Sequence, residues 1–121
     1  NNNKHLLNDF SYIKDCDPIA YERHEKTVDF FNNNMEKGDI MVTHHMPSYK
    51  CVNDKYKNSS LNCYFACDLD ELIKDKKPSM AFCGHTHLGF DFMLYKTRMM
   101  CNPLGYYDEN PYFNDSFTIE V

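Results

Sequence analysis

Two short histidine motifs contain the residues with the clearest capacity for chemistry. His44 and His45 lie in the stretch VTHHMPS, and His85 and His87 lie in GHTH. Neutral imidazoles are good ligands for zinc, iron, manganese and similar divalent cations. We therefore predict that His44, His85 and His87 bind metal. His45, next to a ligand, is better placed to contact substrate or to support the metal site from outside it.

Both motifs follow short apolar runs that predict buried strands. Residues 40–42 (IMV) precede His44, and residues 80–83 (MAFC) precede His85. A helix between two parallel strands returns the chain to the same edge of a sheet, which is where ligands collect in open α/β folds. On an extended backbone His85 and His87 would also point the same way. The sequence thus predicts that the three imidazoles converge; the alternative is that GHTH is a chance pair on an exposed strand end.

The remaining sequence predicts the other elements of a mixed α/β layer structure. Asp17 suits the N-cap of a helix over residues 18–36 and Asp68 the N-cap of a second helix that Pro78 ends. A polar stretch, residues 48–61, predicts a long surface loop. Period-two alternation after His87 predicts a hairpin that turns at KTR, residues 96–98, and SFTIEV predicts a closing strand.

Length, charge and cysteine content narrow the functional class. A chain of 121 residues with 42% apolar content suits one domain, residues 1–121. Its net charge of −5 and scattered lysines argue against binding to nucleic acid or to an anionic membrane. No secretory or transmembrane segment is evident, so we expect a cytoplasmic protein with reduced thiols. Cys63 or Cys67 in CYFAC, together with the histidines, would be an alternative zinc site.

Carboxylates are needed beside the imidazoles if the site is to hold two dications. Two such ions about 4 Å apart require carboxylates that bridge them and offset their charge. The chain contains no Asp-x-His, no Gly-Asp-x-x-Asp and no Gly-Asn-His pattern. Its three predicted histidine ligands would therefore hold one metal ion at best without help from elsewhere.

The two histidine motifs resemble the last two metal motifs of the calcineurin-like metallophosphoesterases. The stretches FACDLDELI, GFDF, TRMMCNPLGY and TIEV are also similar to the C-terminal half of small bacterial, phage and giant-virus members. The resemblance implies one half of a four-layer α/β/β/α sandwich. It also implies a centre of two divalent metal ions of the Mn, Zn, Fe or Mg type, at which a metal-activated hydroxide hydrolyses phosphate mono- or diesters.

Matched motif by motif, the resemblance assigns a role to each histidine. His44 and His85 would bind one metal ion, His87 would bind the other, and His45 would act in catalysis near the substrate phosphate. The first three motifs of the family are missing from this sequence. We therefore expect activity only with a complementary N-terminal half-domain polypeptide. The alternative is a non-catalytic scaffold or interaction module with a degenerate phosphoesterase fold.

Overall fold

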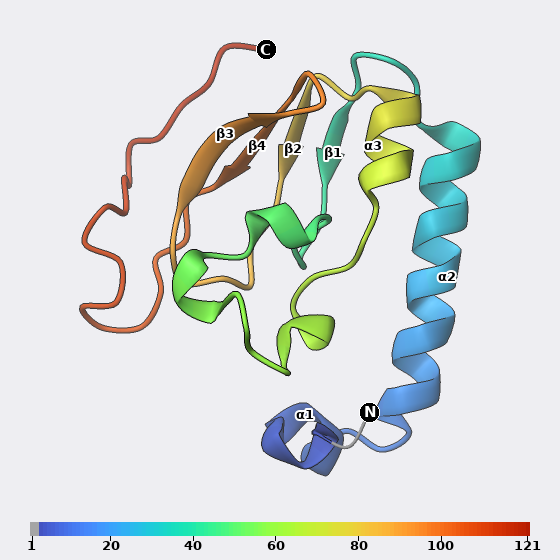
Figure 1. Ribbon diagram of the computed structural model, residues 1–121, viewed down its shortest axis with the longest axis vertical. Coiled ribbons are helices and arrows are strands. Elements are labelled where there is room, and N and C mark those ends of the chain that lie inside the picture. Colours follow the sequence, from blue (N-terminus) through green and yellow to red (C-terminus); the bar gives the residue numbers. More distant parts are fainter. Residues whose placement is uncertain (1–2) are drawn as a thin grey trace. The chain divides into compact units, whose positions relative to one another are not determined.

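The computed structural model describes residues 3–121, which form two compact units. The first unit ends at Met35, and the second spans Glu36–Val121. Figure 1 shows the elements, which combine helices with a four-stranded sheet. The α/β class predicted from the sequence is confirmed. All four strands and the histidines of both motifs lie in the second unit.

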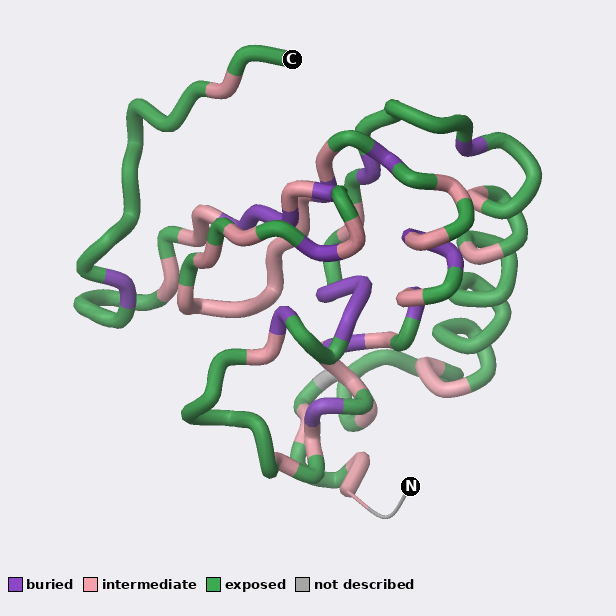
Figure 2. Tube along the Cα trace, turned by 45° about the horizontal axis from the view of Figure 1, so that its top comes forward, coloured by how far each residue is buried: buried purple, intermediate pink, exposed green. Residues whose placement is uncertain are grey.

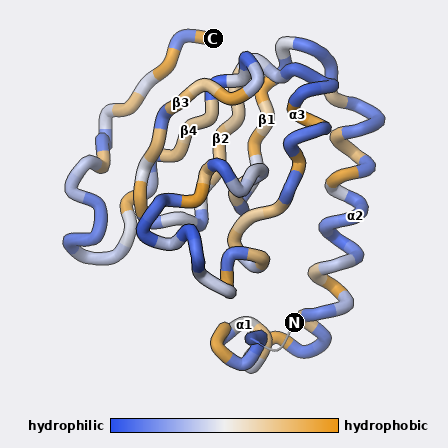
Figure 3. Tube along the Cα trace, viewed as in Figure 1, coloured by the Kyte–Doolittle hydropathy of each residue, from blue (hydrophilic) through white to orange (hydrophobic). Residues whose placement is uncertain are grey.

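Within its described residues, the first unit contains helices and the turns that join them. A 3-10 turn, Lys4–Leu6, is followed by α1 (Asn8–Tyr12) and by the long helix α2 (Cys16–Asn34). The predicted helix is confirmed, but the predicted cap is wrong, because Asp15 is the N-cap and Asp17 lies in the first turn. No residue of α2 is buried: Figure 2 shows it as exposed or intermediate, and Figure 3 shows its polar and apolar residues interleaved.

The second unit is built on a mixed sheet with the strand order β1-β2-β4-β3. The strands are β1 (Ile40–Val42), β2 (Met80–Phe82), β3 (Phe90–Leu94) and β4 (Thr97–Cys101). β1 pairs with β2 and β2 with β4 in parallel, whereas β3 and β4 form an antiparallel hairpin. The helix α3 (Asp70–Lys76) lies in the connection from β1 to β2. The predicted parallel crossover is confirmed.

One face of the sheet, here the covered face, is buried. Met41, Ala81 and Met99 occupy matching positions on three adjacent strands and are at most 2% exposed. Thr97 on the same face donates its hydroxyl to the carbonyl of Pro78, just after α3, at 2.7 Å. Ile73 of α3 is fully buried. The core of the second unit is therefore the apolar layer between α3 and this face.

The opposite face of the sheet, here the open face, exposes apolar side chains on the two outer strands, whereas Met100 of β4 on the same face is only 1% exposed. Val42 is 67% exposed and Met93 is 63% exposed, and Ile40 is also exposed. Arg98 and Asp91 form a two-point ion pair between β4 and β3, at 2.9 and 2.6 Å. A strand face that carries Val, Ile and Met is usually covered in a globular protein.

Two short 3-10 turns, Tyr49–Cys51 and Asp54–Tyr56, interrupt the loop predicted over residues 48–61, and a third, Asn62–Tyr64, follows it before α3. Figure 1 shows this green segment beyond the end of the sheet at which β1 and β2 finish. Asp70 ties its start to the core. The carboxylate of Asp70 accepts hydrogen bonds from Ser48 Oγ at 2.6 Å, from Tyr95 Oη at 3.0 Å and from the Lys50 ammonium.

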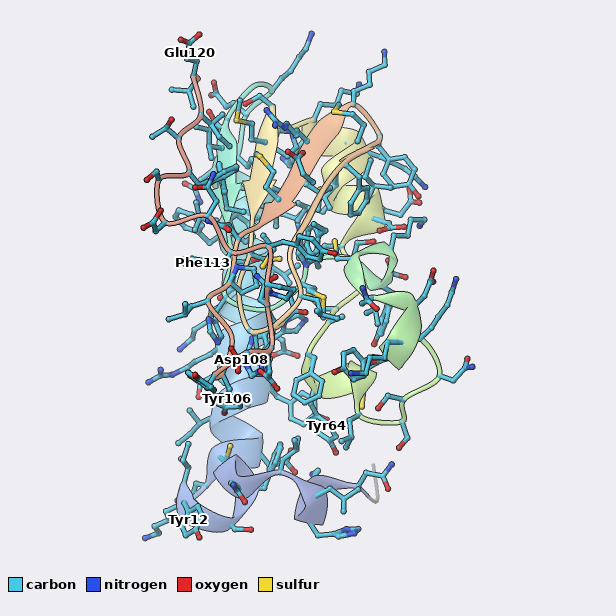
Figure 4. All side chains as sticks on the ribbon, turned by 90° about the vertical axis from the view of Figure 1, so that its left-hand side faces the viewer. Tyr12, Tyr64, Tyr106, Asp108, Phe113 and Glu120 are labelled. Atoms are coloured by element: carbon cyan, nitrogen blue, oxygen red, sulfur yellow. The ribbon has the colours of Figure 1, made fainter. Side chains whose placement is uncertain are left out.

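Besides the N-cap of α2, element boundaries differ from the sequence predictions at four places. The N-cap of α3 is Leu69, although Asp68 still accepts the backbone N–H of Asp70 at 3.3 Å. β2 ends at Phe82, one residue early. The hairpin turns at Tyr95 and Lys96 rather than at residues 96–98. The predicted closing strand over residues 116–121 is wrong, and Figure 4 shows the chain running past Phe113 to Glu120 as irregular backbone.

The hairpin turn offers a way to stabilise the second unit. Tyr95 and Lys96 both have positive φ, 50° and 74°, which non-glycine residues adopt at a cost of roughly 1 kcal/mol each. Because Lys96 is exposed, we expect Lys96→Gly to raise the free energy of unfolding by about 1 kcal/mol. Urea denaturation measures this change. Lys57→Gly, at an exposed lysine with φ of −53°, should instead lower stability.

Candidate metal centre

His44 and His85 meet at the ends of β1 and β2. Their Nε2 and Nδ1 atoms lie 3.0 Å apart. Backbone hydrogen bonds fix this approach, because Gly84 N–H donates to the His44 carbonyl and Thr43 N–H donates to the Phe82 carbonyl, both at 2.9 Å. The ladder between the parallel strands thus continues into both histidine motifs. It brings together two side chains that are 41 residues apart in the sequence.

His45 completes a group of three imidazoles. Its ring centroid lies 4.6 Å from that of His85 and 5.0 Å from that of His44. One ring nitrogen from each of the three residues can be chosen so that all lie within 4.8 Å of one another. Ligand nitrogens of a tetrahedral zinc ion lie about 3.3 Å apart, given Zn–N bonds of about 2.0–2.1 Å. Small side-chain rotations would therefore let this group hold one cation.

The backbone of His85 is not extended, contrary to the prediction. Its φ is 61°, in the left-handed region that non-glycine residues seldom occupy. The alternation of side chains along a strand therefore stops at β2. The prediction that His85 and His87 point the same way because the backbone is extended is wrong, since a left-handed residue interrupts that backbone.

His87 lies against the turn that follows β4 rather than in the group of three. Its Nδ1 is 2.6 Å from Oε2 of Glu109, and its ring meets that of Tyr106 edge-on with centroids 4.5 Å apart. Figure 4 labels Tyr106 and Asp108 in this turn. The backbone N–H of Tyr106 and the hydrogen bond with His87 lower the pKa of Glu109. The structure thus joins His44 to His85 as predicted, brings in His45, and gives His87 a carboxylate partner.

An aromatic side chain and a short backbone bridge support the group of three from the segment before α3. The ring of Phe65 lies 4.9 Å from that of His85. Met46 and Ala66 form an isolated parallel bridge, in which Met46 N–H donates to the Phe65 carbonyl at 3.1 Å. Phe65 is thereby held beside His85, where it limits the movement of that ring.

The alternative zinc ligands, Cys63 and Cys67, lie outside the group of three. Cys67 Sγ donates to the Met46 carbonyl at 3.6 Å, and burial raises the pKa of this thiol. Burial also raises the pKa of Cys51, to about 12. Because zinc binds the thiolate form, the raised pKa values disfavour Cys67 and Cys51 as ligands. No disulfide links any of the six cysteines in the described part of the chain.

Three residues of this region escaped prediction: Glu109, Phe65 and Asp70. Glu109 stands 22 positions after His87 in a polar turn, with no spacing that relates the two. Phe65 belongs to an aromatic stretch that is equally typical of a core. Asp70 is one of several acids near the start of the predicted second helix, and nothing in the sequence distinguishes it. A pattern of apolar and polar residues cannot reveal such contacts, because they depend on how separate loops fold back on the sheet.

Comparisons with protein-family models, with curated proteins and with solved structures find no match for this chain. Within residues 3–121, no helix has both the length and the apolar character needed to span a membrane.

The group of three histidines contains no carboxylate among the described residues. The donor set of this chain therefore suits one divalent cation, and a second cation would need ligands from outside the group.

Proposed function

We propose that this chain supplies the histidine half of a metal-dependent phosphoesterase of the calcineurin-like type. The observation that carries the proposal is the 3.0 Å approach of His44 and His85 at the ends of two parallel strands. Bound cations would activate a water molecule and offset the charge of a phosphoester. Around them, His44 and His85 would hold one ion, His87 would face the other, and His45 would contact the phosphate.

The missing ligands are the reason to propose a complementary polypeptide. Asp-x-His, Gly-Asp-x-x-Asp and Gly-Asn-His motifs would supply the bridging carboxylate and the remaining donors, and this sequence contains none of them. The open face, with Val42 and Met93 exposed, supports the same idea. A second sheet packed on that face would bury these side chains and bring its own metal motifs to the edge where β1 and β2 end.

Reconstitution tests the proposal. The chain is mixed with a polypeptide that carries the three missing motifs, and hydrolysis of p-nitrophenyl phosphate and of bis-p-nitrophenyl phosphate is measured with Mn²⁺. We expect neither polypeptide alone to be active, the mixture to hydrolyse at least one of the two esters, and His85→Ala to return the mixture to the background rate. His24→Ala, at an exposed position on α2, is the matched control and should leave the rate unchanged.

The same mixture distinguishes the enzyme hypothesis from the scaffold hypothesis. A complex that forms but binds little metal and hydrolyses neither ester would support a non-catalytic interaction module. A complex whose rate is unaffected by His85→Ala would contradict both the metal site and the proposed chemistry. Cys67→Ser should leave metal binding intact, because the group of three contains no cysteine.

A further inference from the structure

The turn formed by residues 105–109 is built closely around His87. Gly105 has a φ of 73°, and a side chain at this position would lie 3.5 Å from the Cβ of His87 and 3.3 Å from that of Glu109. The hydrogen bond between His87 Nδ1 and Glu109 Oε2, at 2.6 Å, closes this arrangement. The turn and the GHTH motif therefore meet through both backbone and side chains.

Glu109 is itself held in place by the turn. Its Oε2 accepts the backbone N–H of Tyr106 at 2.9 Å, and its own N–H donates to the Tyr106 carbonyl at 3.1 Å. Next to it, the side-chain amide of Asn110 donates to the Pro103 carbonyl at 2.5 Å and anchors the end of the turn. The Tyr106 ring, edge-on to His87, limits rotation of the imidazole. The carboxylate is thus positioned before any ligand arrives.

This geometry dictates which nitrogen of His87 carries the proton. An ionised carboxylate only accepts hydrogen bonds, so Nδ1 of His87 must be the donor. In a neutral imidazole the other nitrogen, Nε2, then keeps its lone pair. Free histidine prefers the opposite tautomer, with the proton on Nε2. The preference of His87 for the Nδ1–H tautomer therefore has to come from its surroundings.

We propose that Glu109 is a positioning residue that holds His87 in the Nδ1–H tautomer and leaves Nε2 free to bind a divalent cation. The cation-binding part rests on the proposed function, in which His87 faces the second metal ion. Carboxylate partners of this kind set the ring orientation and the basicity of histidine ligands in metal sites. Glu109 acts only through His87 and does not itself touch the cation.

Long-range ¹H–¹⁵N spectra of the metal-free chain test the proposal without any activity. They are recorded on the wild type, Glu109→Ala and Glu109→Gln, at a pH where the imidazole is neutral. His87→Ala identifies the His87 signals, and Glu25→Ala on α2 is the matched control. We expect the wild type to show Nδ1 protonated, and Glu109→Ala to reverse the order of the two nitrogen resonances. Glu109→Gln, which keeps an acceptor oxygen, should retain the wild-type pattern.

The outcomes of the two experiments test the role of Glu109 separately from the proposed phosphoesterase function. A wild-type His87 protonated on Nε2, or a pattern unchanged in Glu109→Ala, would overturn the role of Glu109 and leave the reconstitution experiment unaffected. An inactive mixture with the expected tautomers would count against the phosphoesterase and leave Glu109 as a positioning residue. Backbone amide spectra check that each variant is folded, and the wild-type spectrum alone decides the tautomer if Glu109→Ala does not fold.

Discussion

Replacing His44 or His85 with alanine is expected to abolish the proposed binding of one divalent cation by this chain. Loss of a supporting group outside the ligand set already costs about 10- to 100-fold in metal affinity, so loss of a ligand should cost at least about 100-fold. The two nitrogens that are 3.0 Å apart would each supply one bond to the ion. Isothermal titration calorimetry with Zn²⁺ or Mn²⁺ measures the affinity of each variant for the cation.

His45 and His87 distinguish two ligand sets in the same experiment. The ring nitrogens that converge belong to His44, His45 and His85, whereas His87 contacts Glu109. His45→Ala should therefore weaken binding and His87→Ala should leave it close to that of the wild type. The reverse pattern would restore the ligand set predicted from the sequence. Binding that survives in both His44→Ala and His85→Ala would mean that neither set holds the ion.

Asp70→Ala is expected to cost about 2 to 3 kcal/mol of the free energy of unfolding at pH 7. The Asp70 side chain is 14% exposed and accepts hydrogen bonds from three groups. Removing it would leave the hydroxyl of Ser48, which is fully buried, without its acceptor. Urea denaturation measures the loss. Asp54→Ala should change stability little, because its carboxylate is 93% exposed beside Lys57.

The stability contributed by Asp70 should also depend on pH. Burial alone would raise the pKa of Asp70, but the hydrogen bonds from Lys50, Ser48 and Tyr95 outweigh burial and lower it below the ordinary value of 3.8. The contribution is thus present above the unfolded pKa and is lost as the pH falls through the folded pKa. The difference between the wild type and Asp70→Asn should shrink from pH 6 to pH 3. A constant difference would contradict the ionised network.

The connection from β1 through α3 to β2 is the feature that the sequence predicts best, because the sequence signals for these elements are local and strong. Two apolar runs, each followed directly by histidine, left few alternatives to parallel strands joined by a crossover helix. His44 and His85 therefore lie at one edge of the sheet, as predicted. β1 and β2 match their predicted ranges to within one residue.

Features that depend on loop geometry could not be predicted in this way. A short segment such as residues 116–121 can be typical of a strand in composition, but its composition does not say whether a neighbouring strand is available for pairing. An extended backbone from His85 to His87 would place the two side chains on one side, and the sequence does not show that His85 breaks it. A left-handed His85 and a turn some 20 residues downstream decide the partner of His87 instead.

Because His85 has a left-handed backbone, the residue that would be best for stability at this position differs from the residue that would bind a cation. If every amino acid were tried at this position, a screen for thermal robustness should rank glycine and asparagine above alanine, because both tolerate a φ of 61°. A screen for cation capture should reject all three, since none carries an imidazole. Position 85 is thus one at which improving the fold and improving the chemistry call for different residues.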